Sequence, residues 1–275
     1  MIFSLWRPFA FNRFLLNKLS HSVSFSTTNR LDSVSSPNLS VNVDPERNVS
    51  HSEPMIIDPL DVPDYFDVHS LVSLRKLFDS RAHLGHKDGS TNEYMTSYLY
   101  GSRLGVTIID LNQTVARLKD ALNFTAHIAF RGGVILFVSN HKETGQYVEK
   151  VAKECNEYAH CRHYQTSTLT RSRNFFGKVM RLPDLCIFLS TFNNVFLEHD
   201  GIRDCAKMFI PSVAICDSNS DPRLVTYPVP GNDDTPMAIH LYCDLFKEAI
   251  LRGKARREEI LKEISAESKE SFGDE

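Results

Sequence analysis

Residues 211–234 read PSVAICDSNSDPRLVTYPVPGNDD, and this stretch is the most informative part of the chain. It begins with a short apolar run typical of a buried strand, and a second apolar run lies near its middle. Clusters of Asp, Asn, Ser, Pro and Gly, which each favour turns, bracket the second run. Loops at strand ends often carry function because the scaffold fixes their position. The acidic and amide side chains could therefore indicate a metal or sugar site at a sheet edge.

Outside this stretch, apolar runs alternate with helical patterns along most of the chain. Strands are expected at residues 106–111, 134–138, 185–189, 212–215 and 226–229. Helices are expected at residues 70–78, 114–130, 143–159, 201–208 and 238–257. Because the expected strands are almost entirely apolar and alternate with helices, they predict a parallel sheet with helices on both faces.

Several motifs, taken in order along the chain, resemble one family. Residues 81–87 read RAHLGHK, 98–103 read YLYGSR, 108–114 read IIDLNQT and 181–185 read RLPDL. Together with DSNSDP at 217–222 and VPGNDD at 229–234, these motifs resemble the universal second protein of the small ribosomal subunit. The resemblance covers roughly residues 71–255, and the run at 121–130 is similar to the animal mitochondrial form.

The resemblance implies a flavodoxin-like, doubly wound α/β domain with a structural role in mitochondrial translation, no cofactor and no catalysis. Its implied partners are small-subunit rRNA and other proteins of the mitochondrial small ribosomal subunit, in the matrix. The matching residues are expected to support the structure: His83, Gly85, His86, Asp217, Asn219, Asp221, Pro222, Pro230, Gly231, Asn232, Asp233 and Asp234. One or more of the last three should accept free amides at the start of the final helix.

The N-terminal segment has the composition of a targeting sequence. Residues 1–30 carry four cations, interleaved serines and no acid, which is typical of a mitochondrial transit peptide. Residues 31–66 lack helical or alternating periodicity, so they are expected to be an extended or disordered arm. Residues 67–255 should form the α/β domain, and 256–275 a charged tail. No stretch reaches the roughly 18 apolar residues that span a bilayer.

Charge and cysteine content narrow the function further. The formal net charge is −3, and it falls to near −7 when the leader's four cations are removed with no acids. Most isolated RNA-binding domains are basic, so this charge favours a single basic patch on RNA and protein contacts elsewhere. The six cysteines have no regular spacing and do not indicate a disulfide framework.

The best candidate for RNA contact lies between Glu157 and Asp184, where no acidic residue occurs. Guanidinium groups pair with phosphates, and aromatic rings stack on bases. The residues expected to contact RNA are Arg162, His163, Arg171, Arg173, Lys178 and Arg181. They are interleaved with Tyr164, Phe175 and Phe176. The alternative is a solvated basic loop whose aromatic side chains belong to the core.

The same segment differs from the family pattern. Thr166 and Ser167 stand where the resemblance leads one to expect paired glycines, which argues against a close approach of backbone to RNA there. Bacterial members insert a long helical hairpin after this point. Here only the eleven residues 171–181 lie between Thr170 and Leu182, too few for such a hairpin at about 1.5 Å per helical residue.

A nucleotide-dependent enzyme is the main alternative function, because doubly wound domains often bind dinucleotides. That function needs a Gly-x-Gly-x-x-Gly turn between the first strand and its helix. Residues 110–114, which follow the first expected strand, read DLNQT without a glycine, and Asp110 or Asn112 is better explained as a helix cap. A regulatory binding protein that works off the ribosome is a third possibility.

Two groups of side chains contain residue types that bind metals. His83 and His86 could share a helical face, and a second group consists of Cys155, His160, Cys161 and His163. Neither has the Cys-x-x-Cys spacing typical of zinc sites, so ordinary packing is favoured for both and no metal is expected.

Overall fold

The computed structural model describes residues 59–177, 181–194 and 197–270. The predicted transit peptide and most of the predicted arm lie outside these residues. At the described end of the arm, the side chain of Phe66 is buried in a hydrophobic core. The Nε atom of Arg256 donates a hydrogen bond to Oη of Tyr65 at 3.0 Å. Residues just before position 67 therefore already pack on the domain.

Five parallel strands form the central sheet. They are β4 (Ile135–Val138), β5 (Tyr158–His160), β6 (Leu185–Phe188), β9 (Ser212–Cys216) and β10 (Tyr227–Pro230). Their spatial order is β10-β9-β6-β4-β5, and every neighbouring pair is parallel. Counted along the chain, this is the flavodoxin-like order 2-1-3-4-5. The predicted fold class is thus confirmed.

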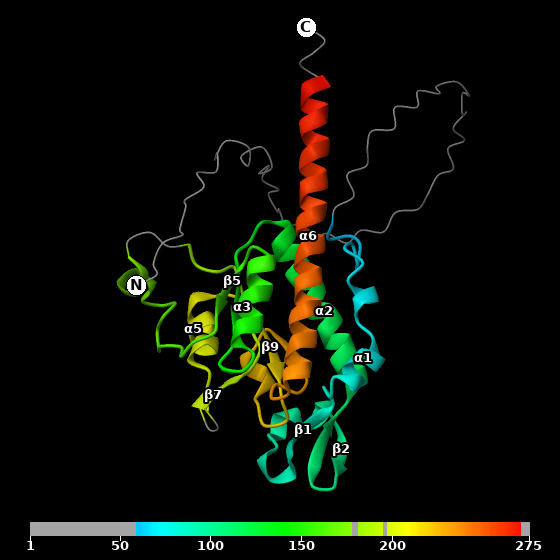
Figure 1. Ribbon diagram of the computed structural model, residues 1–275, viewed down its shortest axis with the longest axis vertical. Coiled ribbons are helices and arrows are strands. Elements are labelled where there is room, and N and C mark those ends of the chain that lie inside the picture. Colours follow the sequence, from blue (N-terminus) through cyan, green and yellow to red (C-terminus); the bar gives the residue numbers. More distant parts are fainter. Residues whose placement is uncertain (1–58, 178–180, 195–196, 271–275) are drawn as a thin grey trace, which may run out of the picture. The chain divides into compact units, whose positions relative to one another are not determined.

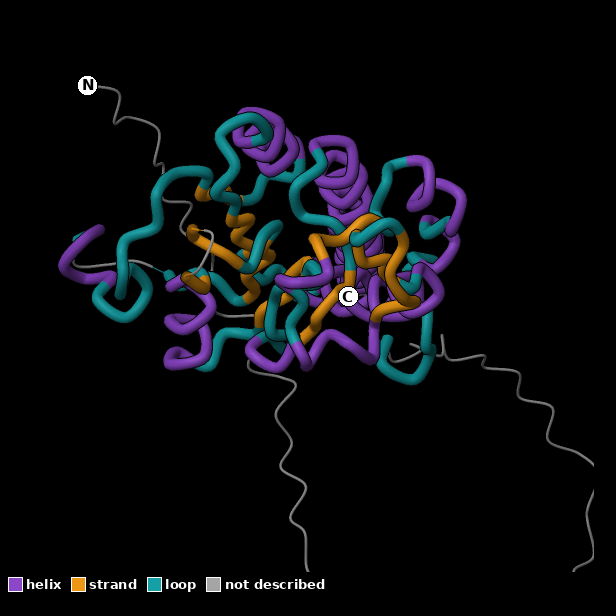
Figure 2. The backbone as a smooth tube through the Cα atoms, turned by 90° about the horizontal axis from the view of Figure 1, so that it is seen from below, coloured by secondary structure: helices purple, strands orange, loops and turns teal. Residues whose placement is uncertain are grey.

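Alternating side chains of the strands serve two separate cores. In β4, Ile135 and Phe137 belong to the first core and Val138 to the second. The first core is covered by α2 (Leu111–Phe130), α3 (Gly145–Glu154) and α6 (Pro236–Glu270), which lie side by side in Figure 1. The second is covered by α5 (Asp200–Met208). Helices therefore flank the sheet on both faces, as the view in Figure 2 also shows.

A small antiparallel sheet accompanies the main one. It consists of β1 (Leu84–Lys87), β3 (Val106–Ile109) and β2 (Leu99–Arg103), in that spatial order. The prediction that residues 106–111 form the first strand of the parallel sheet is therefore wrong. The apolar sequence of a short strand indicates that the strand is buried. It does not indicate which other strand it pairs with. The first strand–helix turn of the doubly wound sheet is instead residues 139–144, between β4 and α3.

The helices largely follow the sequence pattern, with differences at their ends. Asp110 caps α2, because its side chain accepts a hydrogen bond from the backbone N–H of Asn112 at 3.0 Å. α3 ends at Glu154, before the predicted end at 159, because Asn156 turns the chain with φ 55° and β5 follows. α6 continues to Glu270, well past residue 257. None of the described helices has the length and apolar composition needed to cross a membrane.

The remaining elements are short. Between Thr170 and Leu182, the described residues contain only α4 (Ser172–Phe176), so the long hairpin of bacterial relatives is not found there. The others are η1 (His69–Leu71), α1 (Leu74–Asp79), η2 (Asp88–Ser90), η3 (Glu93–Tyr98), β7 (Phe192–Asn194), β8 (Leu197–Glu198) and η4 (Pro222–Leu224).

Candidate functional site

Loops that follow β4, β6, β9 and β10 meet at the carboxyl edge of the parallel sheet. They enclose a cleft of about 630 Å³. The polar residues that line the cleft include His86, Asn140, His141, Ser190, Asn219, Asp233 and Asp234. In doubly wound domains ligands usually bind at this edge, where the strand order reverses between β4 and β6. The cleft is therefore the candidate functional site.

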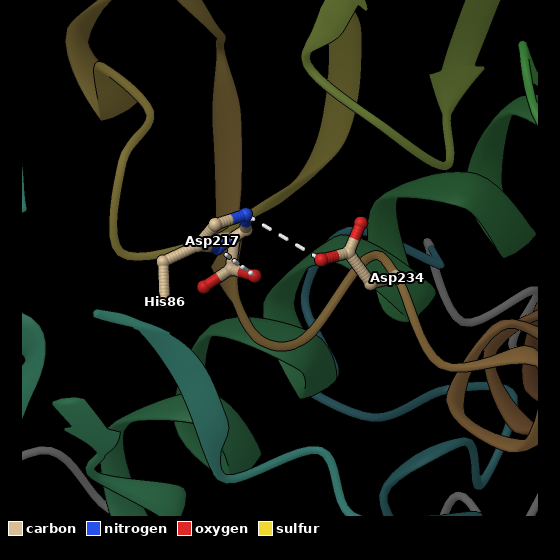
Figure 3. A group of neighbouring side chains, drawn as sticks. All are labelled: His86, Asp217 and Asp234. Atoms are coloured by element: carbon tan, nitrogen blue, oxygen red, sulfur yellow. Dashed lines mark ion pairs between the residues drawn. The ribbon is translucent and has the colours of Figure 1, made fainter. Parts of the chain in front are cut away.

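The imidazole ring of His86 lies between two carboxylates (Figure 3). Its Nδ1 atom is 2.9 Å from Oδ2 of Asp217, and its Nε2 atom is 3.4 Å from Oδ2 of Asp234. The Asp217 side chain is buried, whereas that of Asp234 is exposed. Nδ2 of Asn219 lies 3.5 Å from Nε2 of His86. Motif residues far apart in the sequence thus meet at one point.

The cluster binds protons more tightly than its isolated members would. The contact with Asp217 raises the pKa of His86 to about 9, with smaller contributions from the charges of Asp217, Asp234 and Asp233, while burial acts in the opposite direction. Burial raises the pKa of the Asp233 carboxyl group, and the negative charges of Asp217 and Asp234 raise it further. His86 is therefore expected to be an imidazolium at neutral pH.

Gly85 lets strand β1 come close to the loop after β9. A Cβ atom at this position would lie 2.6 Å from Oγ1 of Thr107 and 2.9 Å from Oγ of Ser218. The adjacent backbone N–H of His86 donates to the same Oγ of Ser218 at 2.8 Å. A side chain at residue 85 would push these segments apart, so the glycine is what allows His86 to reach Asp217.

The turn after β10 supports the start of α6. The Asn232 side chain accepts hydrogen bonds from the backbone N–H groups of Asp234 at 2.9 Å and Thr235 at 3.2 Å. Its Nδ2 atom donates to the carbonyl oxygen of Arg81 at 3.1 Å. Gly231 leaves room for the buried ring of Tyr242, whose Oη a Cβ atom would hit. The turn thus connects the sheet, the final helix and the segment before β1.

Four other motif residues serve local structure. The ring of His83 stacks on Phe78 with centroids 4.6 Å apart, and burial lowers its pKa. Because His86 lies in strand β1 and His83 directly precedes it, the two do not share a helical face. The Asp221 carboxylate pairs with Arg223 at 2.8 Å, Pro222 is buried, and Pro230 ends β10.

The cluster around His86 could hold a proton or a cation. Among the described residues, only His86, Asp217 and Asp234 form a group of three or more ligand-type side chains whose candidate atoms all lie within 4.8 Å of one another. One arrangement is a protonated His86 between two carboxylates. Another is a divalent cation bound by one imidazole nitrogen and two carboxylate oxygens. The raised pKa of His86 favours the first arrangement at neutral pH.

A dinucleotide does not suit this cleft. The first strand–helix turn reads SNHKET at residues 139–144, so it also lacks the glycine fingerprint that lets backbone approach a pyrophosphate. Asp234 lines the same cleft, where its exposed carboxylate would repel phosphate groups. The polar groups at the carboxyl edge instead contact one another.

Sequence reasoning missed several residues of the cleft, among them Asn140, His141 and Ser190. Each closely follows the end of a predicted strand, β4 or β6. Since parallel strands place their carboxyl ends at one edge, this position along the chain was a usable signal.

The residues predicted to contact RNA are spread over two edges of the sheet. Arg162 and His163 follow β5 at the carboxyl edge, whereas Arg181 precedes β6 at the amino edge. Arg171 and Arg173 lie at α4, between those two positions in the chain. All five are exposed, and Lys178 lies outside the described residues.

The aromatic residues of this segment do not all face solvent. The Tyr164 side chain is buried, and its hydroxyl group donates a hydrogen bond to Oδ2 of Asp204 at 3.2 Å. Tyr164 therefore belongs to the core, which is the alternative considered from the sequence. The side chains of Phe175 and Phe176 are outside the described part of the chain.

Comparison with known proteins gives the family. A family model described as "Ribosomal protein S2" matches residues 77–186 and 176–253. The chain is 50% identical over 217 residues to "Small ribosomal subunit protein uS2m" of Bos taurus, with 79% of this chain and 74% of that protein covered. It is 33% identical over 221 residues to "Small ribosomal subunit protein uS2" of Caulobacter vibrioides, with 66% of this chain and 82% of that protein covered. These matches and the flavodoxin-like fold establish that the chain belongs to the ribosomal protein S2 family.

Proposed function

We infer that this chain is a structural protein of the small subunit of the mitochondrial ribosome. It holds small-subunit rRNA and neighbouring ribosomal proteins in place and catalyses no reaction. The observation that carries this inference is the 50% identity to a mitochondrial small-subunit protein, which extends over about three quarters of both chains. The cleft at the carboxyl edge agrees with a structural role, because its polar groups bind one another.

The targeting and localisation follow from the N-terminal composition. Residues 1–30 act as a transit peptide that directs the chain to the mitochondrial matrix, and residues 31–66 follow as an arm. The absence of acids and the four cations in residues 1–30 support this proposal. Import of radiolabelled chain into isolated mitochondria should yield a shorter, protease-protected product.

The rRNA contact is made in part by the basic segment 162–181. Five of its six candidate residues are exposed, and in the described part of the segment only Arg181 forms an ion pair, with Asp184 at 2.7 Å. Exposed guanidinium groups without a carboxylate partner are available to phosphates. Arg171 and Arg173 are the best placed for this, because both are exposed, Arg171 directly before the short helix α4 and Arg173 within it.

Reversing both charges, in the Arg171→Glu/Arg173→Glu variant, should reduce incorporation of the chain into the small subunit roughly tenfold or more. The change replaces two phosphate-binding cations by two anions, which phosphate repels. Incorporation is measured as the fraction of tagged chain that sediments with small-subunit rRNA. Thermal unfolding should be unchanged within a few degrees, because both side chains are exposed.

The matched control is Lys150→Glu/Lys153→Glu on the exposed face of α3, which changes the net charge by the same amount. Its incorporation should stay near that of the unmodified chain. Equal incorporation of the two double variants would contradict the assignment of this segment to RNA.

Removing the chain from cells tests the function itself. Labelling of mitochondrially encoded proteins should fall, and small-subunit rRNA should decrease while large-subunit rRNA remains, because an incomplete small subunit is degraded. Continued mitochondrial translation without the chain would overturn the proposed function.

A further inference from the structure

Three helices that run toward the amino edge of the parallel sheet end in the same kind of turn. In each turn, one residue takes a left-handed conformation. The backbone N–H of the following residue donates to the carbonyl oxygen five residues before it, which is a Schellman turn. The left-handed residues are Gly132 after α2 (φ 72°), Asn156 after α3 (φ 55°) and Phe209 after α5 (φ 55°). The bonds are Gly133 N–H to Ile128 O at 2.9 Å, Glu157 N–H to Ala152 O at 2.8 Å and Ile210 N–H to Cys205 O at 3.0 Å.

Phe209 is the unusual member of this set. Glycine and asparagine are the residues that tolerate the left-handed conformation best, and a bulky aromatic residue is strained there. The strain is not offset by burial of the ring, because Phe209 is 94% exposed. The fold thus places an aromatic side chain in water at a position where glycine would serve the turn better.

Two cations precede Phe209 on the same helix. Arg203 and Lys207 are exposed on α5 itself, six and two residues before Phe209. Among the described residues, no ion pair joins either of them to a carboxylate. The carboxylates of α5 point elsewhere: Asp200 accepts from Thr166, and Asp204 is buried.

The same edge continues into the basic segment. The backbone N–H of Cys186 in β6 donates to the carbonyl oxygen of Pro211 at 3.2 Å, so the start of β6 lies beside the start of β9. Arg181 approaches β6 at this edge, and Phe209 approaches β9. Arg181 also lies 3.5 Å from the carbonyl oxygen of Gly132, which follows the exposed Arg131.

We propose that these residues form one RNA-binding surface, the amino-edge surface (Arg131, Arg181, Arg203, Lys207 and Phe209), and that the Phe209 ring stacks on an unpaired base of small-subunit rRNA. Aromatic rings offer every base a stacking face, and neighbouring cations bind the phosphates on either side. This inference rests on the proposed function. It assigns rRNA contact to the amino edge of the sheet as well.

The surroundings of Phe209 favour RNA over a protein partner. Protein docking on an exposed apolar side chain usually needs a contiguous apolar patch. Here the neighbouring Ile210 is buried and Met208 packs against the second core, so neither extends the exposed apolar surface. A lone aromatic ring among cations matches a nucleotide, which is a flat base joined to a phosphate.

The Phe209→Gly variant separates binding from folding. Glycine relieves the strained backbone, so the melting temperature should stay the same or rise. Loss of one base stack should weaken binding to a full-length small-subunit rRNA transcript roughly 5- to 100-fold. Phe209→Tyr keeps the stacking face and should bind nearly as well as the original chain.

Leu104→Gly is the matched control, because Leu104 is 97% exposed and also has a left-handed φ of 55°, but lies in the β2–β3 turn. It should bind the transcript like the unmodified chain. An equal loss of RNA affinity in the Leu104 and Phe209 variants would reject a specific stacking role for Phe209.

Ultraviolet crosslinking of small subunits isolated with the full chain identifies the partner. Trypsin should release residues 208–223 as one peptide, since no Lys or Arg lies between Lys207 and Arg223. A nucleotide adduct on Phe209 would support the proposal. Adducts only on peptides of segment 162–181, or a crosslink of Phe209 to another protein, would overturn it and leave the proposed function intact. Absence of the chain from small subunits would instead reject the proposed function and this inference with it.

Discussion

The Asp217→Ala variant should lose about 2–4 kcal/mol of unfolding free energy at pH 7, because it removes one partner of a largely buried charge pair. The Asp217 carboxylate lies 2.9 Å from His86, and it also accepts a hydrogen bond from the backbone N–H of Ser218. The variant leaves the His86 ring and a buried N–H without their acceptor. Urea unfolding in EDTA-containing buffer, which removes adventitious metal, measures the loss.

The pH dependence tests the same contact without a mutation. The pKa of His86 is raised to about 9 in the folded protein, from an unfolded value near 6.5. Because the pKa of His86 is higher in the folded than in the unfolded protein, protonation of its ring stabilises the folded state. This stabilisation is complete below pH 6.5 and is lost as the pH rises through 9. His86 should therefore lower the unfolding free energy between pH 6.5 and 9, by at most about 1.4 kcal/mol per pH unit. In Asp217→Ala this slope should largely disappear.

Two control variants distinguish loss of the His86–Asp217 pair from the loss of a hydrogen-bond acceptor or of any carboxylate. Asp217→Asn keeps an acceptor for the Ser218 N–H, so it should lose the pH slope but less stability than the alanine variant. Glu248→Ala removes an exposed carboxylate from α6 and should change stability by less than about 0.5 kcal/mol. A full pH slope in Asp217→Ala would refute the role of this pair.

The Gly253→Ala variant should lower the unfolding free energy by about 1–3 kcal/mol, although alanine is the better helix former. Gly253 lies where α6 crosses α2. A Cβ atom there would be 2.5 Å from the backbone carbonyl oxygen of Ala126 and 3.2 Å from Cβ of Ala129. Backbone cannot rotate away as a side chain can, so the two helices would have to separate.

Gly145→Ala at the start of α3 is the control, because a Cβ atom there would lie 3.4 Å from Cβ of Cys161, an ordinary contact distance. It should be neutral or slightly stabilising. A stabilised Gly253→Ala variant would mean that helix propensity outweighs the close helix contact.

The parallel strands and the packed helices could be predicted because burial leaves a pattern in the sequence. The stretch 212–216, buried at every position, reads as an apolar strand. β1 and β2 could not be found in this way, because most of their residues are exposed or only partly buried. β3 was recognised as a strand but given the wrong partners, since pairing depends on contacts distant in the sequence. β5 has three residues and was taken as the end of the preceding helix.

The site was predictable as a set of residues but not as a geometry. The resemblance indicated His86, Asp217 and Asp234, yet no local pattern shows that residues so far apart in the chain meet within hydrogen-bonding distance. Phe209 could not be identified from its sequence context, where it reads as another apolar residue before a strand. Its exposure follows only from the left-handed turn that ends α5.

The most direct test of the central claim is sucrose-gradient sedimentation of a detergent-solubilised mitochondrial lysate. The chain should sediment with small-subunit rRNA, and RNase treatment should move it to the top of the gradient. A chain that stays at the top in the untreated lysate, while small-subunit rRNA sediments normally, would contradict the claim that it is a structural part of the mitochondrial ribosome.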